Sequence, residues 1–491
     1  DNYLKMIYSD EKKKLGQFFT SNRITEYIVS RTNFDEKKTI IDISCGDGAF
    51  LISCCNHLQQ KNNKKTQDIS NIYGIDIDKK QLTIAKKNIR KICPNFVLKK
   101  NLIVDDVIQS ISQNILKKFP RVQIQKGFDI IVGNPPYVTI KSTKLIKSDP
   151  DFSPLVYGQI NIATLFIGRA YSLLKDGGKL GLLLPKSILR VDSYKKLRDF
   201  LISKFLIEEI IDVGIEFDDV RGEQFILIAT KKQKNSKTIK IGHFLKGKNP
   251  EIQTVSFSNI TKFDNFLLLK NKKTYKLVDT VISKHPNLEQ CSNGKIFRGI
   301  SIDSELNYIS KSPKKNYHKG LRGDSVKKFY YDYFIFIKNK TFSKLDLMKN
   351  KKIVLQNIFS SESGIIANFD DKGLVTLDTV TNIILDCEDP YYVLGILNSS
   401  LIRFFMVFVI YNQSRLTMHT DHKYLSRIPI PNTTTTIKKQ IIKEVKNQLN
   451  TQTSFENLNE LIFDAFDLSN KEKQLVNTSL REFEQRGKKN G

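Results

Sequence analysis

The chain has 491 residues, of which 40% are hydrophobic, enough for two or three domains with a large buried core. Its formal net charge is +28, from 79 Lys and Arg against 51 Asp and Glu, and an excess of that size favours a polyanionic partner, most often nucleic acid. A general compositional bias is the alternative explanation, because the chain is rich in Lys, Asn and Ile.

The cysteines and the apolar stretches argue against several classes of protein. None of the six cysteines forms a C-x-x-C pair, so neither a zinc ribbon nor a redox motif is indicated, and reduced thiols fit a cytosolic protein. The most apolar late stretch, residues 401–411, is too short to span a bilayer and contains Arg403. No secretory signal is visible at the start of the chain. We therefore expect a cytoplasmic protein without a membrane anchor.

Residues 16–20 read Gly-Gln-Phe-Phe-Thr and precede a predicted helix with Ile24, Tyr27 and Ile28 on one face. Ser21 or Asn22 can cap this helix. A helix N-terminus favours an anionic group, such as the carboxylate of a ligand. An ordinary capped surface helix would show the same pattern.

A glycine-rich turn follows the first predicted strand, residues 39–44. It reads Cys45-Gly46-Asp47-Gly48 and leads into an apolar helix. A strand, a G-x-G turn and a helix let backbone amides approach a ligand closely. The next strand, residues 72–75, ends at Asp76, which can accept hydrogen bonds from both hydroxyls of a ribose. This succession predicts half of a nucleoside-binding site.

The third predicted strand, residues 96–104, ends at Asp105 and Asp106. A carboxylate at this position can accept a hydrogen bond from an adenine amine. The alternative is that Asp105 is an exposed turn residue.

The fourth predicted strand runs into Asn134-Pro135-Pro136-Tyr137. Two consecutive prolines fix φ and supply no backbone N–H groups, and the residue before a proline is held extended. Asn134 is therefore held just past the carboxyl end of a strand, where open α/β sheets bind ligands. Its amide oxygen and the Pro135 carbonyl can accept the two hydrogens of an exocyclic amine, while Tyr137 stacks on the ring. A proline-terminated loop without a ligand is the alternative.

Alternating helices and strands continue to about residue 230 and end in what looks like a hairpin, residues 207–213 and 224–229. This pattern predicts a mostly parallel, doubly wound sheet with an antiparallel edge. Residues 141–157 are polar and aperiodic, and could be a mobile loop over the site. We expect an α/β domain over residues 1–235, an α+β domain over residues 236–432 and a helical tail over residues 433–491.

Lysines and aromatic residues are interleaved between residues 314 and 344, with Lys327 and Lys328 beside three consecutive aromatic residues. Cations for phosphates and aromatic rings for bases are typical of nucleic-acid binding. Aromatic residues on a half-buried strand would form the same pattern, so both interpretations stay open. His419 and His422 lack a third ligand nearby, and we expect no metal site.

The motifs and their order over about residues 15–230 resemble the gamma-type N6-adenine DNA methyltransferases, the TaqI-like restriction-modification family with an NPPY motif. The resemblance implies a Rossmann-like S-adenosylmethionine-dependent methyltransferase sheet followed by a target-recognition domain. It also implies S-adenosyl-L-methionine as the cofactor, double-stranded DNA as the substrate, and a bacterial, nucleoid-associated protein. It leaves open a partner that is a restriction nuclease or a specificity subunit.

The family's site residues carry over to matching positions of this chain. The catalytic motif corresponds to Asn134, Pro135, Pro136 and Tyr137. Ser44 stands where the family more often has proline, and we expect no loss from that difference. Phe217, before the last hairpin strand, is the candidate for a second aromatic residue against the base, and Lys327 and Lys328 complete the expected substrate contacts. The implied cofactor contacts are Gln17, Phe18, Thr20, Asp42, Ser44, Cys45, Gly46, Gly48, Asp76, Ile77, Asp106 and Asn134.

Other functions stay open at this point. NPPY serves any planar amide or amine, so an RNA adenine or protein glutamine methyltransferase is an alternative. A non-catalytic nucleic-acid-binding subunit with a vestigial cofactor site is another, although the set of Asp42, Gly46, Gly48, Asp76 and Asn134 is intact. A base deaminase is disfavoured because the chain has no H-x-E followed by P-C-x-x-C.

Overall fold

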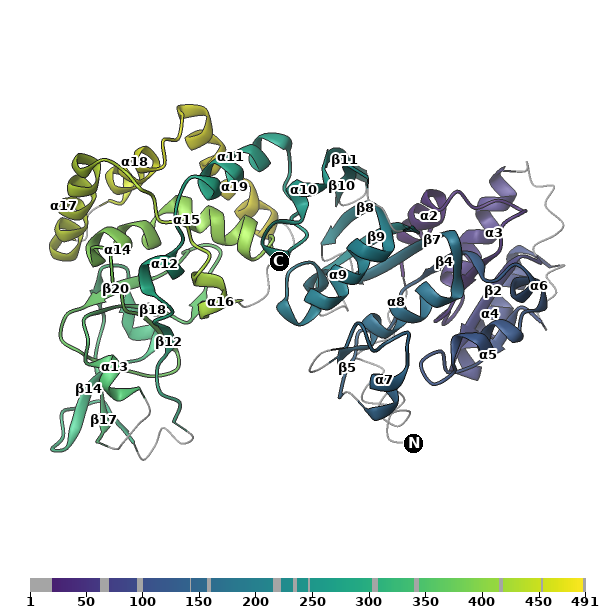
Figure 1. The fold of residues 1–491 in the computed structure, drawn as a ribbon, viewed down its shortest axis with the longest axis horizontal. Coiled ribbons are helices and arrows are strands. Elements are labelled where there is room, and N and C mark those ends of the chain that lie inside the picture. The colour runs from purple at the N-terminus through teal and green to yellow at the C-terminus, as the bar shows by residue number, and fades with distance from the viewer. Residues whose placement is uncertain are drawn as a thin grey trace. The chain divides into compact units, whose positions relative to one another are not determined.

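The computed structural model describes residues 20–61, 70–94, 100–141, 143–156, 160–214, 222–232, 236–245, 248–302, 308–339, 344–414, 418–451 and 454–488. The chain divides into two compact units, Asp1–Leu268 and Leu269–Gly491 (Figure 1). Each unit has its own sheets and its own buried core.

The first unit is built on one nine-stranded sheet in the order β11-β10-β8-β9-β7-β4-β1-β2-β3. Neighbouring strands from β3 to β7 run parallel, because each connection between them passes over a face of the sheet. The strands are β1 (Ile40–Asp42), β2 (Ile72–Asp76), β3 (Leu102–Val104), β4 (Phe128–Gly133), β7 (Leu174–Pro185), β8 (Phe205–Gly214), β9 (Gln224–Lys231), β10 (Thr238–Leu245) and β11 (Lys248–Ser256).

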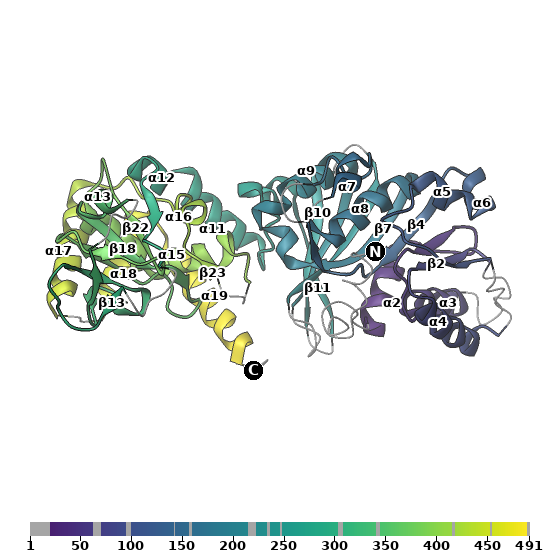
Figure 2. The ribbon, with the colours of Figure 1, turned by 90° about the horizontal axis from the view of Figure 1, so that it is seen from below.

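Helices cover both faces of this sheet, as Figure 2 shows. One face packs against α2 (Asn22–Arg31), α3 (Ala49–Lys61) and α4 (Lys79–Ile92), whose apolar residues join those of β4, β7, β8 and β9 in one core cluster. The other face carries α8 (Ile162–Leu173) and α9 (Lys195–Lys204). The shorter elements of the unit are α5 (Ser112–Lys117), α6 (Pro120–Ile124), β5 (Thr139–Ile140), α7 (Lys144–Ser148), β6 (Ile160–Asn161) and α10 (Phe257–Ile260).

The predicted doubly wound sheet is confirmed, with two differences in its layout. The antiparallel strand β9 lies between β7 and β8 rather than at the edge. The sheet also continues past the predicted boundary at residue 235, because residues 240–243 of β10 pair in parallel with residues 209–212 of β8. Part of the stretch predicted as a mobile loop, residues 144–148, forms α7.

The second unit contains two four-stranded sheets, ordered β12-β22-β18-β20 and β13-β17-β14-β21. Their strands are β12 (Ile296–Arg298), β13 (Ile309–Ser310), β14 (Tyr317–Leu321), β17 (Ile335–Lys338), β18 (Lys352–Gln356), β20 (Ala367–Asp370), β21 (Val375–Thr376) and β22 (Val380–Ile383). Two-stranded pairs are formed by β15 (Val326–Lys327) with β16 (Tyr330–Tyr331) and by β19 (Ile358–Phe359) with β23 (Met418–His419).

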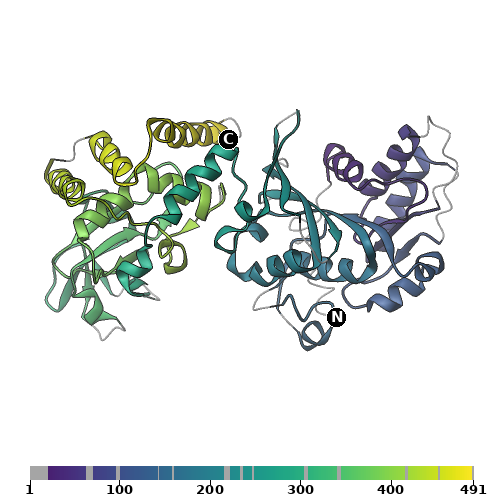
Figure 3. The ribbon, with the colours of Figure 1, turned by 45° about the horizontal axis from the view of Figure 1, so that its top comes forward.

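The helices of the second unit include the predicted C-terminal tail. Gly395 of α14 lies so close to Ile441 and Val445 of α17 that an added Cβ would come within 3.2 and 2.8 Å of them, so the tail packs on this unit (Figure 3). The helices are α11 (Lys272–Ser283), α12 (Leu288–Ser292), α13 (Leu345–Met348), α14 (Pro390–Asn398), α15 (Ser400–Phe405), α16 (His422–Leu425), α17 (Thr435–Thr451), α18 (Glu456–Ala465) and α19 (Asn470–Lys488).

No single helix within the described ranges is long and apolar enough to cross a bilayer. The bent pair of α14 with α15 and the π-helical turn Met406–Ile410 passes a test of length and composition. Most residues of this pair are buried in the core of the second unit.

Candidate active site

The turn after β1 brings glycines to the carboxyl end of the sheet. Asp42, the last residue of β1, is buried, and its Oδ1 accepts a hydrogen bond from the Ser44 N–H at 2.9 Å. Gly46 has a φ of +50°, and no heavy atom lies within 4 Å of the place where its Cβ would stand. Gly48 has a φ of +93°, and an added Cβ would approach that of Ala85 on α4 to 3.2 Å. Gly46 thus leaves open space above the turn, while Gly48 allows α4 to pack closely.

Asp76 joins the tip of β2 to this turn. Its Oδ2 accepts the Gly46 N–H at 2.7 Å, and its Oδ1 accepts the Asp78 N–H at 2.8 Å. An ionised carboxylate has about four lone-pair positions, so each oxygen can accept a further hydrogen bond. Asp76 therefore lies where the sequence predicted a ribose contact and keeps the capacity for one.

The structure separates the roles of Asp105 and Asp106 at the end of β3. Asp105 accepts a hydrogen bond from Ser110 at 2.8 Å and forms an ion pair with Lys118 at 2.6 Å. Asp106 accepts the backbone N–H groups of Ile108 and Gln109 on Oδ1, at 2.9 and 3.1 Å. Its Oδ2 is buried and has no partner among the described residues. Asp106 thus has the free acceptor that an amine would need.

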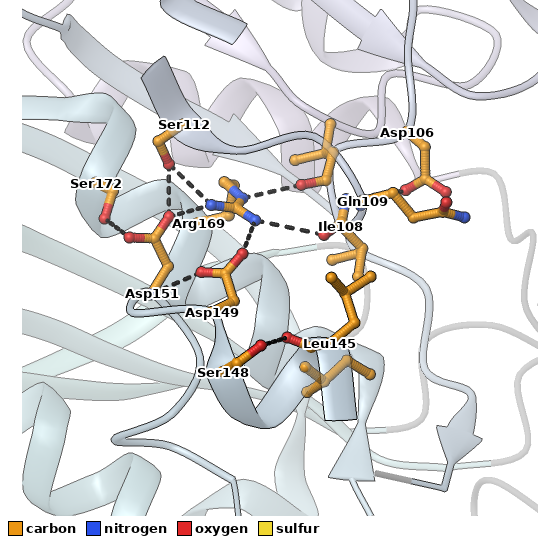
Figure 4. A network of polar contacts seen from close by, with 12 residues as sticks. Asp106, Ile108, Gln109, Ser112, Leu145, Ser148, Asp149, Asp151, Arg169 and Ser172 are labelled. Atoms are coloured by element: carbon orange, nitrogen blue, oxygen red, sulfur yellow. Dashed lines mark hydrogen bonds and ion pairs between the residues drawn. The ribbon is translucent and has the colours of Figure 1, made fainter. Parts of the chain in front are cut away.

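Arg169, in the middle of α8, supports the turn that carries Asp106 (Figure 4). Its Nε donates to the Val107 carbonyl at 2.9 Å, and its Nη2 donates to Asp149 at 2.8 Å. Its Nη1 donates to Asp151, and the guanidinium lies 4.4 Å from the centroid of the Phe152 ring. One buried side chain thus holds together the turn after β3 and the segment after α7. Sequence reasoning missed this residue, although an arginine inside a strongly apolar helix was a usable signal.

Asn134 is fixed in orientation directly after β4. Its Nδ2 donates to the Oγ1 of Thr20 at 3.1 Å, and its Oδ1 accepts from the hydroxyl of Tyr137. These two contacts determine which way the amide points. Because Thr20 lies just before α2, the predicted catalytic motif and the start of this helix meet at the same edge of the sheet.

Tyr137 is anchored at both its backbone and its side chain. Its carbonyl accepts a hydrogen bond from Asn161, the N-cap residue of α8, at 3.1 Å. Its hydroxyl lies 3.0 Å from the Leu183 carbonyl of β7, and burial raises the pKa of this phenol well above its ordinary value. The predicted stacking of the ring on a base stays a prediction.

The acidic residues give the site an affinity for positive charge. Burial, with a further contribution from the Asp76 carboxylate, raises the pKa of Asp42 to about 8. Burial also raises the pKa of Asp76 and of Asp47. A cation brought close to these groups favours their ionised forms. Burial raises the pKa of the Cys45 thiol well above its usual range, which disfavours the nucleophilic thiolate.

The remaining predicted site residues fall into three groups. Gln17, Phe18 and Phe217 lie outside the described residues. Ser44 and Ile77 lie beside Asp42 and Asp76. Lys327 and Lys328 belong to the second unit, where Lys327 lies 3.9 Å from Asp332 and Lys328 donates to the Asn398 carbonyl at 3.2 Å. His419 contacts Asn357 and His422 contacts Glu289, and no metal-binding cluster occurs among the described side chains.

Comparison with known proteins connects both units to restriction-modification systems. A type II restriction enzyme and methyltransferase of Escherichia coli, RM.Eco57I, is 28% identical over 243 residues, which are 39% of this chain and 24% of that protein. A putative type II restriction enzyme and methyltransferase of Methanocaldococcus jannaschii is 26% identical over 311 residues, 58% of this chain and 25% of the relative. The chain thus spans about a quarter of the length of these curated relatives.

A solved structure shares the fold over nearly the whole chain. It is that of the type IIL restriction-modification enzyme MmeI in complex with DNA, with a TM-score of 0.59 and 14% identity, covering 99% of this chain and 78% of that one. Residues 70–217 match the Eco57I restriction-modification methylase family, and residues 301–430 match the TaqI-like C-terminal specificity domain. The chain therefore carries, in this order, a region that matches the Eco57I restriction-modification methylases and a region that matches the TaqI-like C-terminal specificity domains.

Proposed function

We propose that the chain is a site-specific DNA methyltransferase that transfers a methyl group from S-adenosyl-L-methionine to N6 of an adenine flipped out of the duplex. The observation that carries this proposal is the fixed amide of Asn134. Thr20 and Tyr137 orient it at the carboxyl end of β4. The Asp42 turn, Asp76 and Asp106 follow along the same edge, on β1, β2 and β3.

The residues present fit the proposed cofactor. The buried, unpartnered Oδ2 of Asp106 suits the amine of an adenine ring, and the free lone pairs of Asp76 suit a ribose. The open space above Gly46 leaves room for a ligand against the turn. At the start of α2 the Ser21 side chain makes no capping hydrogen bond, so the first N–H groups of this helix can receive the carboxylate of the amino-acid end.

Methyl transfer needs little from the chain beyond positioning. When bound, S-adenosylmethionine supplies a methyl group on a positive sulfonium, which is already a strong electrophile. Adenine N6 is a poor nucleophile because its lone pair is delocalised into the ring. Asn134 Oδ1 and the Pro135 carbonyl can accept hydrogen bonds from the two N6 hydrogens. These bonds draw the N6 lone pair out of conjugation with the ring and point it towards the methyl group. As the new N–C bond forms and the C–S bond breaks, N6 gains a positive charge and becomes strongly acidic, so one of its hydrogens passes to water. Preorganised hydrogen bonds and alignment therefore account for catalysis without a strong general base.

Several features favour double-stranded DNA over the alternative substrates. The charge of +28 suits a long polyanion, and a match to a specificity domain suits a substrate that is read for sequence. Relatives named as combined restriction enzymes and methyltransferases are about four times as long as the matched region. We therefore include a nuclease, fused or separate, among the expected partners. A base inside a duplex must leave the stack to reach Asn134.

The test is methylation-sensitive sequencing of DNA from cells that express the chain, with an Asn134→Ala variant as the matched control. We expect N6-methyladenine at one defined sequence with the natural chain and none with the variant. S-adenosylmethionine should raise the melting temperature of both proteins, because the Asn134 amide faces the acceptor amine and not the sulfonium, and the other implied cofactor contacts are kept in the variant. Stabilisation of both proteins without DNA methylation would redirect the proposal to RNA or protein acceptors. Absence of stabilisation would support a non-catalytic subunit.

A further inference from the structure

The first residue of β9, Gln224, has a buried carboxamide that makes no hydrogen bond to the described part of the chain. It is 2% exposed, and neither its Oε1 nor its Nε2 has a partner among the residues that the structure describes. Buried polar groups in native proteins are nearly always paired, and an unpaired one calls for an explanation such as a ligand. The carboxamide offers one acceptor and two hydrogens in a plane.

Register places Gln224 on the same face of the sheet as the start of α2. Gln224 pairs with Pro185, and two residues further along Ile226 pairs with Leu183. Ile226 and Leu183 both belong to the core cluster that packs against Ile24 and Ile28 of α2. Because residues two apart on a strand share a face, Gln224 also lies on the α2 face.

The level of Gln224 along the strands matches that of Thr20. Gly181 of β7 lies under α2, where an added Cβ would come within 2.7 Å of Ile28 and 3.2 Å of Thr32. From Gly181 to Pro185 a strand advances about 13 Å. From Ile28 back to Asn22 the helix covers about 9 Å, and the extended residue Ser21 carries the chain on to Thr20. Gln224 is therefore at the height of Thr20, the residue that accepts a hydrogen bond from Asn134.

The order of the strands indicates which ligand the carboxamide meets. Along the edge, β3, β2, β1 and β4 carry Asp106, Asp76, the glycine turn and Asn134, which is the track proposed for the cofactor. β7 and β9 follow on the far side of Asn134. At about 4.8 Å per strand, Gln224 lies roughly 10 Å beyond β4. This is the side from which the acceptor must approach.

We propose that Gln224 is a specificity-determining contact to the flipped adenine, with Nε2–H donating to a ring nitrogen next to the amine, N1 or N7. The inference rests on the proposed function. If Asn134 and Pro135 take both N6 hydrogens, the ring nitrogens still need a donor. The carboxamide of Gln224 supplies one on the same face. A contact to N7 distinguishes adenine from cytosine, which lacks this acceptor, whereas a contact to N1 excludes bases that carry an N–H beside the carbon of the amine.

The test combines enzyme variants with modified bases. Gln224→Leu keeps the volume and removes the donor. Gln125→Leu is the matched control, because its carboxamide donates to Thr39 before β1, at the opposite edge of the sheet. The substrate is a duplex with the sequence found by methylation sequencing, carrying adenine, 1-deazaadenine or 7-deazaadenine at the target. Single-turnover rates are measured at saturating cofactor, and cofactor affinity is measured by calorimetry.

We expect Gln224→Leu to lower the rate on adenine about 10-fold to 100-fold, the range for one good contact to a base, with unchanged cofactor affinity. Replacing adenine by one of the two deaza-bases should slow the natural enzyme by a similar factor. The same replacement should not slow Gln224→Leu further, and the deaza-base that shows this pattern identifies the ring nitrogen that Gln224 contacts. The inference is overturned if Gln224→Leu methylates like Gln125→Leu, or if its loss appears as weaker cofactor binding. If sequencing detects no methylated DNA in cells that express the natural chain, the proposed function itself is overturned.

Discussion

The hydroxyl of Tyr137 lies between Asn134 Oδ1 and the Leu183 carbonyl, 3.0 Å from the latter. A phenol has one hydrogen, so it can donate fully to only one of these acceptors at a time. When it donates to Leu183, both lone pairs of Asn134 Oδ1 are available to an incoming amine. We therefore predict two separable tasks for Tyr137: its hydroxyl holds the amide of Asn134, and its ring stacks on a base.

Separate substitutions at Tyr137 divide these tasks. Tyr137→Phe keeps the ring and removes one hydrogen bond of about 1 kcal/mol, so we expect the single-turnover rate to fall about fivefold. Tyr137→Ala also removes the stacking surface, and we expect a fall of about 10²-fold or more. The measurement is methyl transfer at saturating cofactor. Equal losses in the two variants would assign the whole effect to the hydroxyl and contradict a stacking role.

Much of the site could be predicted because its residues directly follow strands along the chain. Asp42, Asp76, Asp106 and Asn134 each stand at a strand's carboxyl end, and parallel strands bring such ends to one edge. The choice between Asp105 and Asp106 needed the structure, since only the contacts with Ser110 and Lys118 show that Asp105 is already engaged.

Other features depend on pairing between distant segments, which single-sequence patterns do not contain. β9 lies between β7 and β8 and pairs antiparallel with both of them. β10 joins the first sheet although the polar residues 231–239 suggested a boundary. Arg169 contacts the Val107 carbonyl and Asp149, which are 62 and 20 residues away in the chain. Gln224 reads as an ordinary strand residue until its burial without partners is known.

The pKa of Asp42 predicts that cofactor binding depends on pH. Burial raises this pKa to about 8, so the folded chain binds more protons than the unfolded chain, whose aspartate pKa is about 3.9. Its contribution to stability therefore falls as pH rises from about 4 to 8. A sulfonium near the site favours the carboxylate, so binding should release protons below pH 8 and tighten as pH rises towards 8.

Calorimetry at pH 7 in phosphate and in Tris measures this proton release directly, since the two buffers differ in ionisation enthalpy. Asp42→Asn provides the control, because it removes the titrating group and keeps the shape. We expect the buffer dependence to shrink markedly in this variant. Proton uptake on binding by the natural chain would contradict the assignment, because it requires a group whose protonated form is favoured.

Arg169 is predicted to be required for both stability and cofactor affinity. Arg169→Met leaves Asp149 and Asp151 without their buried partner, which costs on the order of 3–5 kcal/mol of unfolding free energy. It also frees the turn that carries Asp106, so affinity for S-adenosylmethionine should fall. Urea denaturation and calorimetry measure the two effects. Arg121→Met, at an exposed arginine of α6, is the control and should change neither. An Arg169→Met protein with natural stability would show that the network is dispensable.

The lysines of β14 and of the turn before it are predicted to contribute affinity without sequence information. They are Lys314 and Lys315 in the turn and Lys319 on the strand; all three are exposed, and none has an ion pair among the described residues. If each meets a phosphate, changing all three to glutamine should reduce the slope of log K against log salt by up to about 2.7. The slope should change equally for specific and random duplexes, measured by fluorescence anisotropy.

Lys328 is expected to behave differently from these exposed lysines. Burial and the nearby Arg403 lower its pKa to about 8, and its ammonium donates to the Asn398 carbonyl. Lys328→Met should therefore alter the melting temperature of the second unit more than the salt slope. The opposite result would be a slope of log K against log salt that falls by about 0.9, the value of one phosphate contact, with an unchanged melting temperature. That result would support the DNA contact predicted for Lys328 from the sequence.

The extent of the first sheet predicts where the chain can be divided. A fragment that ends at residue 235 lacks β10 and β11, so it exposes the edge of β8, whose Ile210 and Ile211 are fully buried in the whole chain. Exposed strand edges promote aggregation. A fragment that ends at residue 268 keeps both strands, and we expect it to be soluble, to melt cooperatively and to bind S-adenosylmethionine in calorimetry. Without the region that matches a specificity domain it should have lost methylation at a defined sequence. Methylation of one defined sequence by the fragment ending at residue 268 would place recognition within the first unit.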